Sequence, residues 1–320
     1  MPNRRKSAAP VPNQCKSAAP FLKWVGGKRQ LLPVLRRFYP EPFGRYFEPF
    51  VGSGAVFFDL LRRGALEGGV TLSDDNADLI GCYLRVGDSL GDVIAELDRL
   101  AAGHAAGGRQ HYLGVRDERF NPARAAWRGA GGVVERYPSE LAAMLIYLNR
   151  TGYNGLFRLN ASGEFNVPPG RYDNPTIVDR PLLAVASRAL SGPNMLIRKS
   201  PFDGVLQEAR AGDFVYFDPP YSPLSATSNF RGYTGRAFSS VDQQRLQQVL
   251  IELARRQVHV LLSNSTAPDV TRLYDGNRDT AAAGLRTWRF PARRAVNSKA
   301  DRRGVVQELV VSNLHPRREA

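Results

Sequence analysis

The feature that most constrains the fold is a series of short apolar runs, each followed by a polar or glycine-rich segment. These runs occupy residues 46–50, 70–72, 195–197, 214–217, 258–262 and 309–311. Helical patterns lie between several of them, and Ser239 or Ser240 is expected to cap one of these helices. Apolar strands that alternate with helices are typical of a mostly parallel sheet covered on both faces. The sequence therefore predicts an α/β fold.

The pattern changes between residues 83 and 193, where helical segments, glycine-rich joints and a polar loop replace the strand signals. We expect this stretch to form a mainly helical lobe inserted into a sheet domain made of residues 21–82 and 194–320. Residues 1–20 contain the sequence Lys-Ser-Ala-Ala-Pro twice and no acidic residue, which predicts a disordered basic arm. Such an arm either helps to hold a polyanion or is a solvated tail.

The chain carries a net charge of +14, and a basic surface favours a polyanion because binding releases counterions. Arginine-rich composition is also common in proteins from GC-rich genomes, so the charge by itself leaves nucleic-acid binding open. Residues 286–303 include seven basic residues and one acidic residue. This run predicts a DNA-facing loop, with a solvated charge run as the alternative.

Other features of the composition concern the compartment. No apolar run approaches the roughly 20 residues of a membrane-spanning helix, and the first residues lack the apolar core of a signal peptide. Cys15 and Cys82 form no metal-type cluster and are not expected to form a disulfide. We therefore expect a cytoplasmic protein with no membrane partner and no metal ion, which would be nucleoid-associated if its basic surface binds DNA.

A strand that runs into a glycine turn and then a helix is expected at residues 46–61. Gly52 and Gly54 allow the backbone to turn tightly and approach a ligand, although an ordinary tight turn also explains a lone Gly-x-Gly. Phe57 stands where a dinucleotide-binding turn would have its third glycine. The turn therefore favours S-adenosylmethionine, which has no pyrophosphate, over NAD.

Four polar residues, Ser73 to Asn76, end the second predicted strand. Asp74 is placed to accept hydrogen bonds from ribose hydroxyls, as an acidic residue at this position does in nucleotide-binding sheets. Asp75 and Asn76 are expected to cap the helix that follows.

The most informative segment is Asp218-Pro219-Pro220-Tyr221, which follows four apolar residues. The amino nitrogen of adenine is a poor nucleophile, because its lone pair is delocalised into the ring. Hydrogen bonds to Asp218 and to the Pro219 carbonyl would turn this nitrogen toward tetrahedral geometry and aim its lone pair at a sulfonium methyl group. Tyr221 offers a face for a flipped base. The alternative is a Pro-Pro strand terminator followed by a buried tyrosine.

The polar-aromatic segment of residues 222–238 comes next along the chain. It either closes over an extruded base or is an ordinary surface loop.

Taken together, these segments resemble the Dam-type DNA adenine methyltransferases over residues 21–313 and in the same motif order. The resemblance implies a Rossmann-like methyltransferase domain with an inserted target-recognition lobe and S-adenosylmethionine as methyl donor. It implies a cofactor site at Trp24, Lys28, Phe47, Glu48, Pro49, Gly52, Gly54, Asp74, Ser200, Phe202 and Asp218. Trp24 and Lys28 match the tryptophan and lysine of the opening motif of the family, which contact the methyl donor.

Residues 147–172 are similar to the recognition hairpin of this family. We assign DNA binding to Arg150, Tyr153, Asn154, Leu156, Arg158, Pro168, Arg171 and Tyr172. Arg158 suits bidentate reading of a guanine edge, Tyr153 suits stacking where a base leaves the duplex, and the other two arginines suit phosphates. Without the family, a solvated face or an ordinary ion pair explains each arginine equally well.

Family members that read GATC have an arginine for the first guanine and a leucine and a proline near the thymine. Leu156, Arg158 and Pro168 preserve these residue types, so GATC is the expected target. Phe157 departs from the family, which has cysteine or a small residue there, and the N-terminal arm has no counterpart in the compact members. Both departures are expected to alter flanking-sequence preference or DNA affinity.

We therefore predict a site-specific DNA N6-adenine methyltransferase that flips its target base out of duplex DNA. A cytosine-N4 or RNA methyltransferase is the nearest alternative, although serine or asparagine is more frequent there than the carboxylate of Asp218. A DNA-binding regulator without catalysis predicts decay of the Asp218 segment or the glycine turn, and both are intact. The expected partners are double-stranded DNA and, in a restriction system, a cognate restriction endonuclease.

Overall fold

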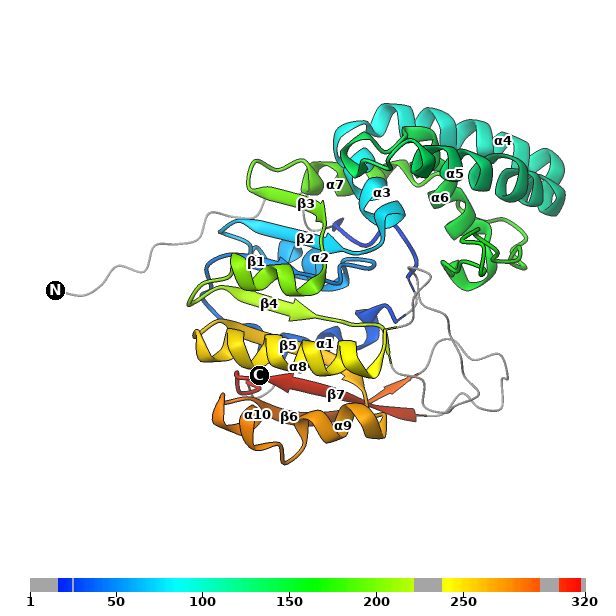
Figure 1. The fold of residues 1–320 in the computed structure, drawn as a ribbon. Helices are drawn as coiled ribbons and strands as arrows, with labels where there is room; N and C mark the ends of the chain where they lie inside the picture. The colour runs from blue at the N-terminus through cyan, green and yellow to red at the C-terminus, as the bar shows by residue number, and fades with distance from the viewer. Residues whose placement is uncertain (1–16, 25, 222–237, 294–304, 318–320) are drawn as a thin grey trace.

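The computed structural model describes residues 17–24, 26–221, 238–293 and 305–317, and it confirms the predicted α/β fold. A seven-stranded sheet has the order β3-β2-β1-β4-β5-β7-β6 (Figure 1). The strands are β1 (Tyr46–Glu48), β2 (Val70–Asp74), β3 (Met195–Lys199), β4 (Phe214–Phe217), β5 (His259–Ser265), β6 (Arg286–Arg293) and β7 (Val305–Ser312). β1 to β5 are parallel, whereas β7 runs antiparallel to β5 and β6. All six predicted strands are present.

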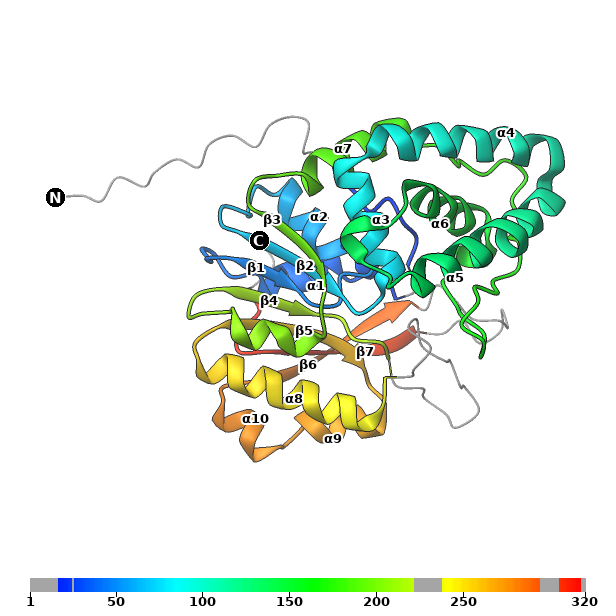
Figure 2. The same cartoon turned by 45° about the horizontal axis from the view of Figure 1, so that its top comes forward.

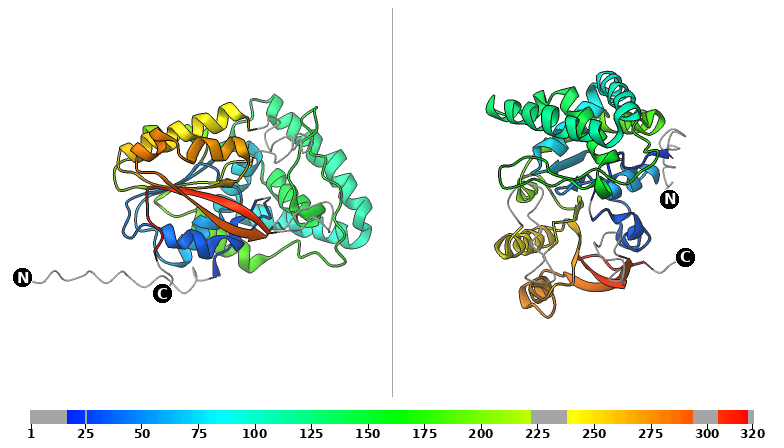
Figure 3. Two further views of the ribbon diagram at one scale, coloured as in Figure 1. Left: turned by 90° about the horizontal axis from the view of Figure 1, so that it is seen from below. Right: turned by 90° about the vertical axis from the view of Figure 1, so that its right-hand side faces the viewer.

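Helices cover both faces of the sheet (Figures 1 and 3). One face carries α8 (Ser240–Arg255), α9 (Pro268–Tyr274) and α10 (Arg278–Ala282); the other carries α1 (Leu32–Leu35), α2 (Ala55–Arg62), α3 (Ala77–Asp88) and α7 (Arg180–Leu190). Strand β4 shows why both faces are apolar. Phe214 and Tyr216 belong to the core under α2, while Val215 and Phe217 belong to the core under α8.

Helix α8 begins with the predicted cap. The Ser239 hydroxyl oxygen accepts a hydrogen bond from the Asp242 backbone N–H at 3.2 Å, and the Asp242 carboxylate accepts one from the Ser239 N–H at 2.8 Å. This reciprocal capping box satisfies two donors at the start of the helix. It fixes the end of α8 that lies nearest to the carboxyl ends of β4 and β5 (Figure 1).

The prediction of a DNA-facing loop for residues 286–303 is wrong for its first part, because Arg286–Arg293 forms β6 at the edge of the sheet. Trp288 and Phe290 alternate with polar residues, and both pack against Phe38, with ring centroids 4.8 and 6.1 Å away. An edge strand tolerates arginine and even Pro291, since one side of it needs no partner. Residues 294–304 lie outside the described residues.

Between β2 and β3 the chain forms a helical lobe that extends past the sheet (Figure 2). It contains α4 (Leu90–Gly114), a π-helical turn (Val115–Phe120), α5 (Asn121–Gly129) and α6 (Ser139–Thr151). The expected lobe boundary at residue 83 falls inside α3. Helix α3 packs against α6 and α7 as well as β3, so one hydrophobic core runs from the sheet into the lobe.

A buried ion pair holds α5 against the beginning of α3. Arg124 Nε lies 2.7 Å from a carboxylate oxygen of Asp78, and both side chains are about 5% exposed. The Tyr137 hydroxyl donates to the other oxygen of Asp78 at 3.2 Å, and the Arg124 guanidinium also donates to the Gly163 carbonyl. The tip of the 147–172 segment is thereby tied to the helix that follows β2.

Two negative findings concern only the residues that the structure describes. No helix there is both long enough and apolar enough to cross a membrane. No three His, Cys, Asp or Glu side chains there are grouped so that they could hold a metal ion. Cys82 is a buried free thiol, and Cys15 lies outside the described residues.

The contact between α3 and Tyr137 gives a stability prediction. A Cβ atom on Gly81 would lie 2.2 Å from the Tyr137 ring, so Gly81→Ala is expected to lower the free energy of unfolding by about 1–3 kcal/mol through overpacking. Gly91→Ala is the control, because a Cβ there meets nothing within 4 Å; we expect no loss and a gain of up to about 1 kcal/mol. Denaturant unfolding measures both, and equal stability of the two variants would contradict the packing.

Candidate active site

The order of the strands reverses between β1 and β4, and this reversal places the site. From β1 the sheet continues through β2 to β3 on one side, and from β4 it continues to β5 on the other. Connections that leave in opposite directions open a crevice at the carboxyl ends of the central strands, where open α/β sheets bind ligands. The glycine turn follows β1 and Asp218 follows β4, so both motifs lie at this crevice (Figure 1).

Lys28 connects the N-terminal segment to the end of β4. Its Nζ lies 2.7 Å from Oδ1 of Asp218, donates to the Gly26 carbonyl at 2.7 Å and lies 4.6 Å from the ring centroid of Tyr221. Burial raises the pKa of Asp218, and the charge of Lys28 partly offsets this effect. Three residues that the sequence assigned to the site therefore meet in space.

Side chains that the sequence analysis did not identify surround this group. The Ser263 hydroxyl donates to Oδ1 of Asp218 at 3.4 Å and lies 2.8 Å from the Tyr216 hydroxyl. The Tyr221 hydroxyl donates to the Glu308 carboxylate on β7. The sequence offered one indication of Ser263, because this polar residue directly follows the apolar run of residues 258–262.

The peptide after Pro220 has its own buried support. Gln243 Nε2 on α8 donates to the Pro220 carbonyl at 3.5 Å, and Asn264 Nδ2 on β5 donates to Gln243 Oε1 at 3.0 Å. Gln243 is 1% exposed and Asn264 is fully buried, so neither amide can exchange its partner for water. A glutamine on the apolar face of a predicted helix was the available sequence signal.

The glycine turn has the backbone conformation that its sequence predicted. Gly52 and Gly54 have φ values of +46° and +67°, in the left-handed region that favours glycine. A Cβ on Gly52 would lie 3.0 Å from the Trp24 ring, and the Gly52 carbonyl accepts a hydrogen bond from the Tyr83 hydroxyl at 3.0 Å. The indole of Trp24 therefore lies directly against the turn.

Asp74 lies at the end of β2, beside this turn. Its carboxylate accepts hydrogen bonds from the backbone N–H groups of Asn76 at 2.9 Å and Gly52 at 3.4 Å, and burial raises its pKa to about 6. Asn76 caps α3, as predicted, by accepting from two backbone N–H groups. The same prediction is wrong for Asp75, which is exposed and lies 3.8 Å from Lys199.

Glu48 is the most deeply buried acid of the predicted cofactor set, at 2% exposure. It accepts hydrogen bonds from the Tyr46 hydroxyl at 2.8 Å and from the Phe57 N–H at 3.1 Å. Burial raises its pKa to about 8, and the nearby charge of Asp218 adds to this shift.

The remaining predicted cofactor residues divide between the crevice and the core. Phe202 stacks on Phe50 with centroids 5.3 Å apart, and Phe238 packs against both rings. The Ser200 N–H donates to the Asp74 carbonyl at 3.2 Å, which joins the ends of β2 and β3. Phe47 and Pro49 are buried, and Phe47 belongs to the core under α8.

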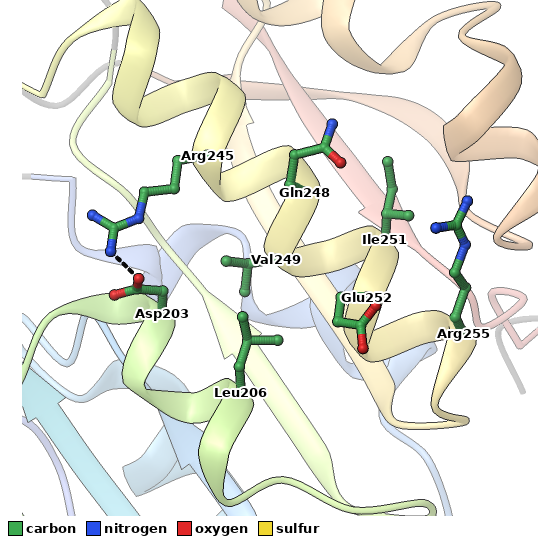
Figure 4. Close-up of a pocket in the computed structure, with 8 residues that line it drawn as sticks. All are labelled: Asp203, Leu206, Arg245, Gln248, Val249, Ile251, Glu252 and Arg255. Atoms are coloured by element: carbon green, nitrogen blue, oxygen red, sulfur yellow. Dashed lines mark hydrogen bonds and ion pairs between the residues drawn. The ribbon is translucent and has the colours of Figure 1, made fainter.

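A hollow of about 300 Å³ lies outside the crevice, between α8 and the 3₁₀ helix Phe202–Gln207 (Figure 4). Arg245 pairs there with Asp203, and its guanidinium carbon lies 5.5 Å from the Phe202 ring centroid. The predicted catalytic residues do not line this hollow. Arg245 lies over the Phe202 ring, which also stacks on Phe50.

The recognition segment forms an irregular hairpin joined by bridges at Gly152–Pro169 and Leu159–Phe165. Its predicted DNA contacts differ in exposure. The exposed ones are Tyr153, Asn154, Pro168, Arg171 and Tyr172. Leu156 is 6% exposed.

The three predicted arginines of this segment have different environments. Arg158 is half-buried and donates from Nε to Asn166 Oδ1 at 2.8 Å and from Nη2 to the Asn166 carbonyl at 3.2 Å. Arg150 donates to the Phe21 carbonyl at 2.8 Å, and burial lowers its pKa. Only Arg171 is fully on the surface.

The segment of Lys23 and Trp24 lies along this hairpin. Asn149 is 2% exposed and forms hydrogen bonds with both backbone groups of Lys23 and with the Gly155 carbonyl, at 2.7–2.9 Å. Trp24 stacks on Phe157 with centroids 5.7 Å apart. Phe157, which departs from the related family, therefore packs between the hairpin and the tryptophan that covers the glycine turn.

A family model and several known proteins match this chain. Residues 24–286 match the model of the D12 class N6 adenine-specific DNA methyltransferases. The chain belongs to this family. It is 37% identical to the type II methyltransferase M1.LlaDCHI of Lactococcus lactis subsp. cremoris, with 92% of this chain and 95% of that protein covered. It is 37% identical to the DNA adenine methylase of Serratia marcescens, with 76% and 82% covered. The Dam-type resemblance is confirmed.

A second relative of similar length is the type II methyltransferase M.MjaIII of Methanocaldococcus jannaschii. It is 38% identical to this chain, with 92% of this chain and 98% of that protein covered. The family match includes the Lys28–Asp218 pair, both strands that end at the crevice and the whole recognition hairpin.

The buried carboxyl of Glu48 gives a pH prediction. Between the ordinary carboxyl pKa of 4.5 and its folded pKa of about 8, the folded chain keeps a proton that the unfolded chain has lost. The contribution of Glu48 to stability is therefore full below pH 4.5 and is lost as the pH rises through 8. We expect Glu48→Gln to lose less unfolding free energy than the wild type between pH 5 and pH 8. Denaturant titrations at several pH values measure this, and parallel curves would contradict it.

Proposed function

We propose that this methyltransferase moves a methyl group from S-adenosylmethionine to the N6 amine of an adenine flipped out of duplex DNA, within GATC. The observation that carries the proposal is the arrangement at the end of β4. Oδ1 of Asp218 is held by Lys28 and Ser263, whereas Oδ2 and the Pro219 carbonyl have no hydrogen-bond donor among the described residues. Two acceptors are therefore available for the two N–H bonds of one amine.

The residues at the crevice fit S-adenosylmethionine chemically. The carboxylate of Asp74 at the end of β2 suits a ribose diol, and the stacked rings of Phe50 and Phe202 are suited to a purine. Gly52 and Gly54 keep the backbone open at the turn, where side chains would crowd Trp24 and Tyr83. When bound, the cofactor supplies an electrophilic methyl group.

The chain's own contribution to the reaction is orientation and electrostatics. Asp218 and the Pro219 carbonyl accept hydrogen bonds from the amine and turn its nitrogen toward tetrahedral geometry, so that its lone pair can form the new N–C bond. The C–S bond would break in the same step and leave its electron pair on the sulfur as a neutral thioether, and one of the two amine protons would be released from the positively charged nitrogen. Proline fixes its φ angle and donates no competing hydrogen bond. Tyr221, anchored through its hydroxyl to Glu308, offers its ring to the extruded base.

The hairpin of residues 147–172 is proposed to recognise the DNA sequence. A guanidinium has five N–H groups, and Arg158 uses two of them on Asn166, which orients the others for a guanine edge. Tyr153, 41% exposed, is placed on the surface where a side chain can wedge into a base stack. Leu156 and Pro168 complete the preference for GATC that the family resemblance implies.

Two further expectations belong to this proposal. Residues 21–82 and 194–320 act as the catalytic domain, and residues 83–193 as the recognition domain. A cognate restriction endonuclease is the expected partner if an endonuclease gene lies next to the gene of this protein. Inspection of the neighbouring genes tests this expectation.

The activity prediction uses tritiated S-adenosylmethionine and duplexes with or without one GATC site. We expect label on N6 of adenine in the GATC duplex alone, and a loss of at least about 100-fold for Asp218→Ala, because the amine loses a buried acceptor. Asp92→Ala, at an exposed position on α4, is the control. Label on cytosine, or wild-type turnover by Asp218→Ala, would refute the mechanism.

The specificity prediction concerns Arg158. Arg158→Ala is expected to reduce the preference for GATC over a duplex changed at the first guanine by about 10- to 100-fold, because a bidentate guanine contact is lost. Arg188→Ala, an exposed arginine on α7, removes the same charge and should keep the preference. The ratio of kcat/KM for the paired duplexes is the measurement, and unchanged ratios for Arg158→Ala would exclude this role.

A further inference from the structure

The two oxygens of the Asp218 carboxylate have different environments. Oδ1 receives the Lys28 ammonium at 2.7 Å and the Ser263 hydroxyl at 3.4 Å. Oδ2 receives no hydrogen bond or ion pair from the described part of the chain. An ammonium alone holds one oxygen but leaves the plane of the carboxylate free to turn about its Cβ–Cγ bond, because a point charge has no directional preference. A second, directional donor to the same oxygen fixes that plane and therefore the direction in which Oδ2 points.

Ser263 is that donor, and Tyr216 fixes its direction. A serine hydroxyl has one proton, so donation to Asp218 requires that it accept from its other neighbour, the Tyr216 hydroxyl at 2.8 Å. Tyr216 is 1% exposed and Ser263 is fully buried, on the adjacent strands β4 and β5. Burial holds the pKa of Tyr216 well above its ordinary value, so the phenol keeps the proton that it donates.

We propose that Ser263 and Tyr216 are positioning residues for methyl transfer, which hold Oδ1 of Asp218 so that Oδ2 is presented to the substrate amine. This inference rests on the proposed function, because it assigns the free oxygen to the adenine N–H. It adds a relay of two hydroxyl groups: Tyr216 on β4 donates to Ser263 on β5, and Ser263 donates to Asp218 at the end of β4. Neither hydroxyl touches the reacting atoms.

A double-mutant cycle tests the relay. Ser263→Ala and Tyr216→Phe each remove one hydroxyl, and each is expected to lower kcat for the GATC duplex by about 10-fold or more, with KM for S-adenosylmethionine changed by less than about 2-fold. Since Tyr216 acts through Ser263, the double variant should be no more than about 2-fold slower than Ser263→Ala. If the two substitutions caused independent structural defects, their fold-losses in kcat would instead multiply in the double variant.

Ser265→Ala is the matched control. Ser265 is a buried serine on the same strand, and its hydroxyl has no hydrogen-bond partner among the described residues. Its loss should leave kcat at the wild-type value. Wild-type kcat in Ser263→Ala, multiplying losses in the double variant, or an equal loss in Ser265→Ala would each overturn the proposal.

A second measurement separates this inference from the proposed function, because it needs no substrate. The Ser263 hydrogen bond lowers the pKa of Asp218, so Ser263→Ala should raise that pKa in a carboxyl carbon-13 NMR titration, while Ser265→Ala should not. Among the described residues, the ionisable groups that face Asp218 are Lys28, Glu48, Tyr216 and Tyr221, and Ser263→Ala leaves all of them in place. An unchanged pKa overturns the relay even where the wild type methylates adenine. A raised pKa in a protein that methylates no adenine supports the relay and refutes the proposed function.

Discussion

The mostly buried carboxylate of Asp218 and the ammonium of Lys28 form the interaction on which the site depends. A buried charge is costly unless an opposite charge meets it, and removal of either partner strands the other. The N-terminal segment must therefore return to the end of β4. Asn149 holds its backbone against the recognition hairpin, and Trp24 fills the space between the glycine turn and Phe157. The ion pair thus joins the N-terminal segment to the sheet, and the contacts of Asn149 and Trp24 join the same segment to the helical lobe.

Polar side chains from three other elements support the segment that carries Asp218. Ser263 and Glu308 reach the site from β5 and β7, and Gln243 reaches it from α8. Each of these groups forms a hydrogen bond with the segment from Asp218 to Tyr221. Such a preorganised set of groups suits a reaction that needs an amine to be aimed rather than a strong acid or base.

Much of the fold could be predicted because its signals are local. The six apolar runs became strands, the glycine turn has positive φ values, and Ser239 caps α8. The errors came from residues with two roles. The arginines of β6 were predicted to lie in a DNA-binding loop, because an edge strand tolerates the same density of charge. Asp75 was predicted to cap α3 together with Asn76, but only Asn76 has the capping position. The phosphate contact expected of Arg150 stays a prediction, and in the structure this side chain donates to the Phe21 carbonyl.

The sequence by itself determined the α/β class, the family and the types of group at the crevice, because period, turn residues and short motifs are encoded over a few neighbouring positions. Only the tertiary structure decided which of these groups meet. Lys28 and Asp218 are far apart in the chain, and Ser263 carries no motif. They meet because β4 and β5 are neighbouring parallel strands and the N-terminal segment returns to the end of β4. The inequality of the two Asp218 oxygens is likewise a product of packing, since it depends on hydroxyl directions that no local pattern specifies.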